Sequence, residues 1–218
     1  MDRSSKNRLT HHMLPHFPGD SLFDRIARAV CRAGCLPRKE LYEAWEVARR
    51  VHRRFHGGRV VDLAAGHGLL AQIMLILDRD FSCALAVDLR IPESAARLAA
   101  EIRTDWAGVA ERFTILQQDL NQVELTSEDL VVSAHACGSL TDLVLERAVA
   151  ARCRVAVLPC CHDLRSADDG ALLGWLDGPL AVDVTRAARL RSQGYRVYTQ
   201  TIPGDITPKN RLLMAEPL

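Results

Sequence analysis

The sequence predicts an α/β fold built on a single, mostly parallel β-sheet, with a helical N-terminal extension and an antiparallel C-terminal hairpin. From residue 58 onward, short apolar runs alternate with helical stretches, which is typical of parallel sheets with helices on both faces. Two final strands follow one another with no helix between them, which predicts an edge hairpin. The length of 218 residues suits one domain with a sizeable core.

Composition places the chain among ordinary globular proteins. Hydrophobic residues make up 48% and charged residues 25% of the sequence. No apolar run approaches the roughly 20 residues that span a bilayer, and the N-terminus lacks the apolar stretch of a signal peptide. We therefore expect a cytoplasmic protein. The seven cysteines, an odd number without a secretory signal, predict reduced thiols rather than a disulfide framework.

Charge divides the chain into two unequal parts. Residues 1–59 hold 13 basic and 6 acidic residues, whereas the remainder is mildly acidic. We assign residues 1–57 to an N-terminal tail and helical extension, and residues 58–218 to the main domain. Within the extension, residues 1–19 predict a frayed, irregular tail. The basic excess favours a polyanionic partner.

The order of elements predicts a Rossmann-like, seven-stranded sheet. Helices are expected from about Asp20 or Ser21, where a cap is available, and over 38–55 before a closing His-Gly-Gly. The predicted strands are 59–64, 83–87, 113–117, 130–134, 154–158, 196–202 and 211–215, and the predicted helices between them are 69–77, 93–106, 140–150 and 180–193.

A loop with two glycines, Ala65-Gly66-His67-Gly68, follows the first predicted strand, which contains Asp62. Its small residues let the backbone turn tightly and approach a ligand closely, and the helix after it presents an N-terminus to negative charge. The loop lacks the G-x-G-x-x-G pattern of dinucleotide folds and resembles motif I, D-x-x-x-G-x-G, of class I methyltransferases that use S-adenosylmethionine (SAM). The alternative is a plain tight turn. The resemblance implies cofactor contacts from Asp62, Leu63, Ala64, Ala65, Gly66, His67 and Gly68.

Two further acids follow the next two strands. Asp88 lies 26 residues after the first acid, near the spacing at which Rossmann-like folds place a ribose-binding carboxylate. Asp119 resembles the acid that contacts the adenine amine of SAM. Each acid alone is more often a solvated loop residue, but three acids at the ends of successive strands lie at the edge where ligands of open α/β sheets bind. We therefore add Asp88, Leu89, Asp119 and Leu120 to the expected SAM contacts.

Histidine and cysteine cluster after the fourth and fifth strands, in His135-Ala136-Cys137-Gly138 and Pro159-Cys160-Cys161-His162. Three interpretations stay open. Sulfur and nitrogen ligands suit zinc; a histidine base can act beside cysteines that only pack; and a stabilised thiolate can act as a nucleophile or methyl carrier. Adjacent cysteines chelate awkwardly, so we assign no metal ligands.

These loops resemble those of a methyltransferase group. Residues 133–142 are similar to its H-x-C-G-x-x-T-D motif, residues 159–162 to its C-C-H motif, and residues 206–211 to a closing motif. The group includes eukaryotic tRNA 2′-O-methyltransferases acting near the acceptor end and related methyltransferase-like proteins. The resemblance covers about residues 38–218 and implies methyl transfer from SAM. The zinc-finger regions of the tRNA enzymes have no counterpart here.

Two histidines are the candidate catalytic bases, because imidazole titrates near neutral pH. These are His135 and His162, and Asp142 at the start of the next helix is expected to orient one of them. The alternatives are that Asp142 is a helix N-terminal acid and that His135 contacts the methionine end of SAM.

RNA is the acceptor that the charge distribution favours, through a hydroxyl or amine group. The basic residues expected to hold its phosphates beside the SAM edge are Arg49, Arg50, Arg53 and Arg54. The alternative is the solvated face of an amphipathic helix. A protein or small-molecule acceptor, a non-catalytic SAM-binding subunit, and a metal or thiol sensor on the same fold also stay open.

Overall fold

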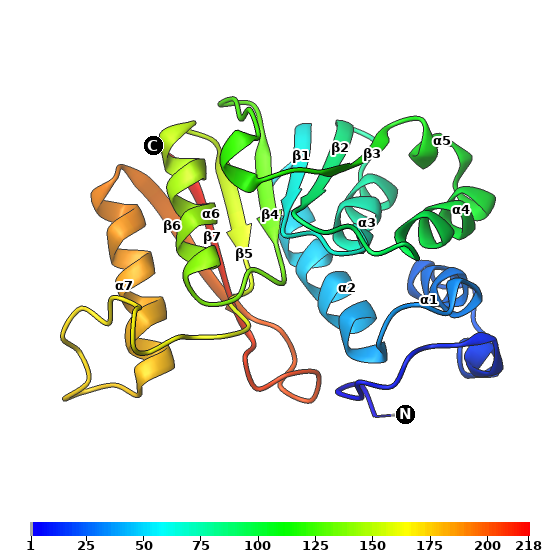
Figure 1. The fold of residues 1–218 in the computed structure, drawn as a ribbon, viewed down its shortest axis with the longest axis horizontal. Coiled ribbons are helices and arrows are strands. Elements are labelled where there is room, and N and C mark those ends of the chain that lie inside the picture. The colour runs from blue at the N-terminus through cyan, green and yellow to red at the C-terminus, as the bar shows by residue number, and fades with distance from the viewer. Residues whose placement is uncertain (1) are drawn as a thin grey trace.

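A computed structural model describes residues 2–218 and shows one seven-stranded sheet in the order β3-β2-β1-β4-β5-β7-β6 (Figure 1). Strands β1 to β5 are parallel, and β7 runs antiparallel to both β5 and β6. The predicted α/β architecture with a C-terminal antiparallel hairpin is confirmed. The strands are β1 (Gly58–Leu63), β2 (Phe81–Asp88), β3 (Phe113–Gln117), β4 (Leu130–Ser133), β5 (Arg154–Val157), β6 (Tyr195–Thr201) and β7 (Arg211–Pro217).

Helices cover both faces of the sheet and form two apolar cores. One core joins the sheet to the N-terminal helices and to α3 and α4, and the other joins its opposite face to α6 and α7. The helices are α1 (Leu22–Ala33), α2 (Arg38–His52), α3 (Leu69–Leu77), α4 (Ala95–Asp105), α5 (Ala107–Ala110), α6 (Ser139–Ala150) and α7 (Gly178–Ser192), with short 3-10 turns η1 (His11–His16) and η2 (Leu120–Gln122). None of the helices in residues 2–218 is long and apolar enough to cross a membrane.

Local sequence explains the ends of α1. Ser21 caps its start, where the Asp24 backbone N–H donates to the serine oxygen at 3.1 Å. Gly34 ends the helix in a left-handed conformation, with φ of 62°. The helix α3 is apolar except for Gln72 because it lies between α2 and the sheet, and residues 69–75 are all buried.

The N-terminal segment is docked on the domain, so the prediction of a frayed tail is wrong. Leu9 and Phe17 are buried in the same core as α1 and α2. The Leu9 backbone N–H donates to the Leu36 carbonyl at 2.9 Å, and Arg8 pairs with Pro37 in a short antiparallel bridge. Polar composition and two prolines suggested disorder, but two apolar side chains suffice to fix the segment.

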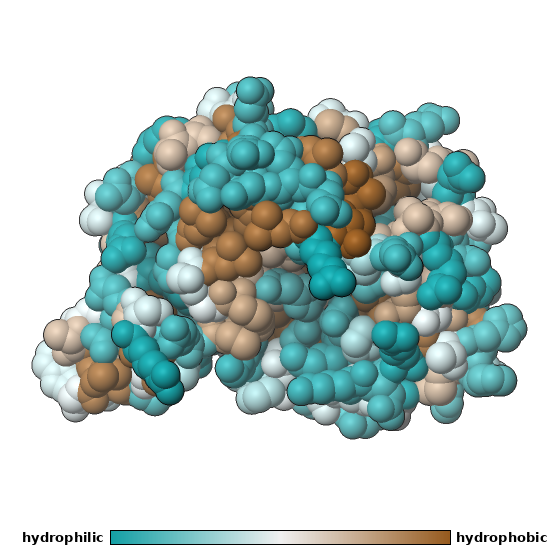
Figure 2. Space-filling model, in the orientation of Figure 1, coloured by the Kyte–Doolittle hydropathy of each residue, from teal (hydrophilic) through white to brown (hydrophobic). Residues whose placement is uncertain are grey.

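The connection between β3 and β4 contains only the short turn η2, whereas full helices join the other consecutive pairs of strands from β1 to β6. One face of β3 is therefore left partly uncovered, and Leu116 is 40% exposed there. Figure 2 shows hydrophobic surface over the middle of this side of the molecule. Asp88 ends β2 and Asp119 follows the end of β3, so both acids lie at the carboxyl edge of the sheet.

Candidate functional site

The loop after β1 is tied to the end of β2 by backbone and side-chain contacts. The Gly66 backbone N–H donates to the Asp88 carboxylate at 2.9 Å, and the Ala65 N–H donates to the Val87 carbonyl at 3.1 Å. Ala64 and Gly66 have positive φ values of 58° and 53°. The sharp turn therefore brings the two predicted cofactor segments into direct contact.

Two glycines of this loop differ in the space around them. At Gly66 an added Cβ would meet no atom within 4 Å, so this backbone faces open space. At Gly68 an added Cβ would lie 2.8 Å from the Phe113 ring and 3.0 Å from the Ala86 side chain. Gly66 therefore permits close approach of a ligand, whereas Gly68 permits close packing of α3 on the sheet.

The first acid of the motif is buried rather than exposed to the loop. Asp62 is 1% exposed, and its carboxylate accepts a hydrogen bond from the Ala71 backbone N–H in α3 at 3.3 Å. Burial, with a smaller contribution from the nearby Asp88 charge, raises the pKa of Asp62 to about 8 against the effect of that hydrogen bond. Asp62 thus fixes the start of α3 from within the core.

The residues present fit SAM. The first-turn N–H groups of α3 and the open face of Gly66 suit a carboxylate, and a carboxylate at Asp88 can accept hydrogen bonds from ribose hydroxyls. Leu89 is 64% exposed beside it, and Asp119 is exposed with one oxygen bonded to the Asn121 N–H. Leu120 is buried, so its side chain belongs to the core.

His135 lies beside the cofactor loop. Together with Asp62, Gly66 and His67 it lines a cavity of about 30 Å³ that Glu40 of α2 closes from the other side. Burial, with a smaller contribution from the positive charge of Lys39, lowers the pKa of His135 to about 4. His135 is therefore a neutral imidazole at neutral pH, suited to accepting a hydrogen bond from an acceptor group.

His162 is held in a buried ion network that sequence reasoning did not find. Its Nε2 lies 2.7 Å from Asp183 of α7, and its Nδ1 is buried without a partner in the described chain. The guanidinium of Arg211 also donates to Asp183, at 2.6 Å. Burial acts to raise the pKa of Asp183, but hydrogen bonds from His162 and Arg211 outweigh it and hold the pKa below its usual range.

Asp142 contacts neither candidate base among its hydrogen bonds, which differs from the expected orienting role. Both of its carboxylate oxygens accept from Arg186, at 2.8 Å each. Arg186 also donates to the Gly138 carbonyl at 3.2 Å. The bidentate geometry fixes α7 against the loop after β4. A partner 44 residues away in sequence gave no local signal.

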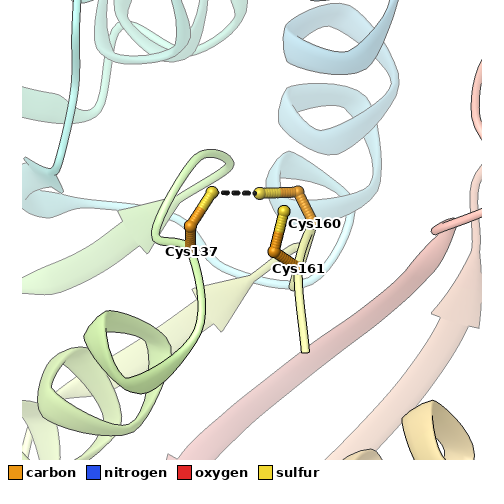
Figure 3. A group of neighbouring side chains, drawn as sticks. All are labelled: Cys137, Cys160 and Cys161. Atoms are coloured by element: carbon orange, nitrogen blue, oxygen red, sulfur yellow. Dashed lines mark hydrogen bonds between the residues drawn. The ribbon is translucent and has the colours of Figure 1, made fainter. Parts of the chain in front are cut away.

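The three cysteines of the two loops come together in space (Figure 3). The Sγ atoms of Cys137 and Cys160 are 2.9 Å apart, and those of all three, with Cys161, lie within 4.8 Å of one another. Burial raises the pKa of both the Cys137 and Cys160 thiols. Without another ligand they are protonated at neutral pH, which disfavours a free thiolate nucleophile.

The basic stretch at the end of α2 contacts the C-terminal hairpin, and its expected phosphate contacts stay a prediction. The first turns of α2 line the cavity at Glu40 and Ala44, and Arg53 follows roughly 20 Å further along at 1.5 Å per residue. Arg50 donates to the Thr201 carbonyl at 3.1 Å, and Arg54 hydrogen-bonds with Tyr198. The chain then enters β1 from the opposite edge of the sheet.

Other basic residues surround the cofactor edge instead. Burial lowers the pKa of His67, and the charges of Arg8 and Arg97 add to that effect. Lys39 acts in the same way on His135, and Lys209 acts on Cys137 against the effect of burial. Arg8, Arg97 and Lys209 are exposed. Their separation in sequence explains why no run of basic residues identified them.

Comparison with known proteins gives one family and many similar folds. A family model described as a methyltransferase domain matches residues 38–167, more than half of the chain. No curated protein matches the sequence.

Solved structures with similar folds include an O-methyltransferase family protein from Burkholderia thailandensis, at a TM-score of 0.56 and 17% identity over 96% of this chain and 63% of that one. The B. subtilis m1A22 tRNA methyltransferase TrmK has a TM-score of 0.51 and 15% identity over 79% of this chain and 65% of its own. The methyltransferase domain of bacterial CtHen1-C has a TM-score of 0.56 and 14% identity, over 82% of this chain and 98% of its own. This chain thus spans less than two thirds of the first two structures.

Proposed function

Because the chain belongs to the methyltransferase-domain family and is a SAM-dependent methyltransferase, we propose that its acceptor is RNA, methylated on a hydroxyl or amine. The observation that carries this proposal is the set of basic residues around the cofactor edge, Arg8, Lys39, Arg97 and Lys209. They come from four separate segments, and their charges act on His67, His135 and Cys137 of the loops at this edge. Phosphate groups are the ligands that such a distribution attracts.

The residues of the site have distinct proposed roles in methyl transfer. SAM, when bound, supplies the electrophilic methyl group. Gly66 and the first turn of α3 hold its carboxylate, and Asp88 holds its ribose. Transfer then depends mainly on in-line positioning of the acceptor and exclusion of water. The neutral His135 accepts a hydrogen bond from the acceptor hydroxyl or amine and orients its lone pair toward the cofactor.

His162 and Asp142 are proposed as positioning residues. His162 bonds Asp183, Asp142 bonds Arg186, and Arg186 itself lies 3.4 Å from Asp183. This network joins the loops after β4 and β5 to α7. Its role is to hold the acceptor side of the site, whereas His135 adjoins the cofactor loop.

We also propose membership of the H-x-C-G and C-C-H methyltransferase group. The two motifs lie far apart in sequence, yet the Gly138 N–H of one donates to the Cys161 carbonyl of the other at 3.1 Å. Their cysteines are gathered at the same point. A pair of motifs that forms one structural unit supports a shared ancestry better than either motif does separately.

Calorimetry with SAM tests the cofactor site first. Wild-type protein is expected to bind SAM, and Asp88→Ala is expected to lose that binding while it retains the wild-type far-ultraviolet circular dichroism spectrum. A mutant that binds SAM as tightly as the wild type would contradict the assigned ribose contact.

Transfer of labelled methyl groups from SAM then tests the acceptor. We expect label in RNA, and we expect a double variant, Arg8→Ala with Lys209→Ala, to bind RNA more weakly with a shallower salt dependence. Arg53→Ala is the matched control, since Arg53 is exposed but lies beyond the site. The RNA proposal would be refuted if Arg53→Ala weakened RNA binding as much as the double variant does. It would also be refuted if labelled methyl groups appeared in protein extracts and not in RNA.

A small-molecule acceptor is the second candidate, and one observation favours it. A cavity of about 480 Å³ lies between α7 and the hairpin β6–β7, within the size range of ligand pockets. Its wall is mainly apolar but includes Asp183 and Arg211 of the ion network. Methylation of extracted metabolites without methylation of RNA would favour this candidate.

A further inference from the structure

We propose that Cys137, Cys160 and Cys161 form a three-thiolate site for a zinc ion. The residues come from the loops after the neighbouring strands β4 and β5, at the edge of the sheet that also carries the cofactor loop. Figure 3 shows the three sulfur atoms turned toward a common point. Thiolate sulfur is a preferred ligand of zinc.

The distances require only small shifts to hold the ion. A Zn–S bond of about 2.3 Å in a tetrahedral site places sulfur atoms roughly 3.8 Å apart. The three Sγ atoms now lie within 4.8 Å of one another, with Cys137 and Cys160 at 2.9 Å. Movements of about 1 Å, within the reach of side-chain rotation, bring all three to bonding distance. Adjacent cysteines in the sequence therefore do not prevent shared coordination here.

The third sulfur favours an ion over a disulfide bond. A disulfide between Cys137 and Cys160 would leave Cys161 without a partner although its sulfur is part of the same cluster. A metal ion uses all three. The loops are also held in register by the hydrogen bond from the Gly138 N–H to the Cys161 carbonyl, at 3.1 Å. Lys209 adds a nearby positive charge that offsets the net negative charge of three thiolates and one zinc ion.

The fourth coordination position is open. Among the described residues 2–218, no further histidine, cysteine or carboxylate places a ligand atom within the same 4.8 Å cluster. Cys137 and Cys161 are exposed, so solvent or substrate can reach the ion. Three protein ligands with an open position are the arrangement of catalytic rather than structural zinc sites. An acceptor oxygen, nitrogen or sulfur bound there would lose its proton more readily; this role rests on the proposed methyl transfer, whereas the metal binding does not.

Metal analysis of the purified full chain tests the site directly. Protein prepared under reducing conditions, stripped with a chelator and reloaded with zinc is expected to retain one zinc ion per chain. Cys161→Ser is expected to weaken zinc binding by roughly tenfold to a hundredfold or more. Cobalt loading is expected to give the thiolate-to-cobalt absorption and visible bands of a tetrahedral site. Cys83→Ser is the matched control, because Cys83 lies on β2 outside the cluster.

Several outcomes would overturn the proposal. These are a zinc-free protein with a mapped Cys137–Cys160 disulfide after the same preparation, retention of zinc by Cys161→Ser, and copper in place of zinc. Zinc that is lost in His56→Ala but kept in the cysteine variants would place the ion at the separate cluster of His52, His56 and Asp78. Circular dichroism confirms that each variant is folded. None of these readouts requires methyl transfer, so their failure is distinguishable from failure of the proposed function.

Discussion

The two loop glycines provide a paired test of the cofactor site. Alanine at either position must adopt a left-handed backbone, because φ is 53° at Gly66 and 70° at Gly68. That conformation costs about 1–2 kcal/mol for a residue with a Cβ. At Gly66 the new methyl group meets open space and adds nothing further. At Gly68 it lies 2.8 Å from the Phe113 ring, and such overpacking costs about 1–3 kcal/mol more.

Thermal unfolding and SAM calorimetry are expected to rank the Gly66→Ala and Gly68→Ala variants in opposite orders of damage. With a shift of about 2–4 °C for each kcal/mol in a chain of this size, Gly66→Ala is expected to lower the melting temperature modestly and Gly68→Ala clearly more. For SAM affinity at a temperature where both variants are folded, Gly66→Ala is expected to be the more damaging, because its methyl group occupies the space left for the ligand.

Two results would refute this reasoning. If Gly66→Ala binds SAM with wild-type affinity, the open space at that glycine is not where the cofactor approaches. If Gly66→Ala loses as much stability as Gly68→Ala, the close contact between α3 and the sheet is not what requires glycine at the second position.

Three further predictions concern stability. Burial raises the folded-state pKa of Asp62 to about 8, so the stability contributed by the protonated side chain is complete below about pH 4 and is lost as pH rises through 8. Asp62→Asn is therefore expected to flatten the pH dependence of the free energy of urea unfolding over that range. An unchanged pH dependence would contradict the raised pKa of Asp62. Asp183→Asn removes the charge that pairs with His162 and Arg211, and it is expected to lower the free energy of urea unfolding by about 3–5 kcal/mol. Asp168→Asn, in an exposed pair with Arg189, is the control and is expected to lower it by less than about 1 kcal/mol. Similar losses in the two variants would argue against a special role for the ion network of Asp183. Leu9→Ala is expected to cost about 2–5 kcal/mol in thermal or urea unfolding, and a neutral effect would restore the interpretation of a frayed tail.

Regular elements were predictable where local pattern and tertiary environment agree. The helix α3 and the strand β3 begin and end at the predicted residues, 69–77 and 113–117. For α3, a run that is apolar except for Gln72 directly follows a glycine that permits the turn, so one local signal sets its start.

The parts that could not be predicted depend on contacts between distant segments. The stretch Arg49–Arg54 was expected beside the cofactor edge, but Arg50 and Arg54 bond residues of β6 that lie 151 and 144 residues later in the sequence. The partner of His162 is Asp183, 21 residues later on α7. No periodicity or motif indicates which acid on a neighbouring helix will face a given histidine, since that depends on how α7 packs.

The contacts of the docked N-terminal segment bear on the order in which parts of the protein fold during synthesis. Arg3 forms an ion pair with Asp205, 202 residues later, and Arg50 bonds the Thr201 carbonyl. During synthesis the first residues leave the ribosome long before these partners exist. Contacts of such high sequence separation form late. The contacts of Arg3 and Arg50 with the C-terminal part of the chain are therefore completed only after that part has been made, whereas burial of Leu9 and Phe17 against the N-terminal helices can precede it.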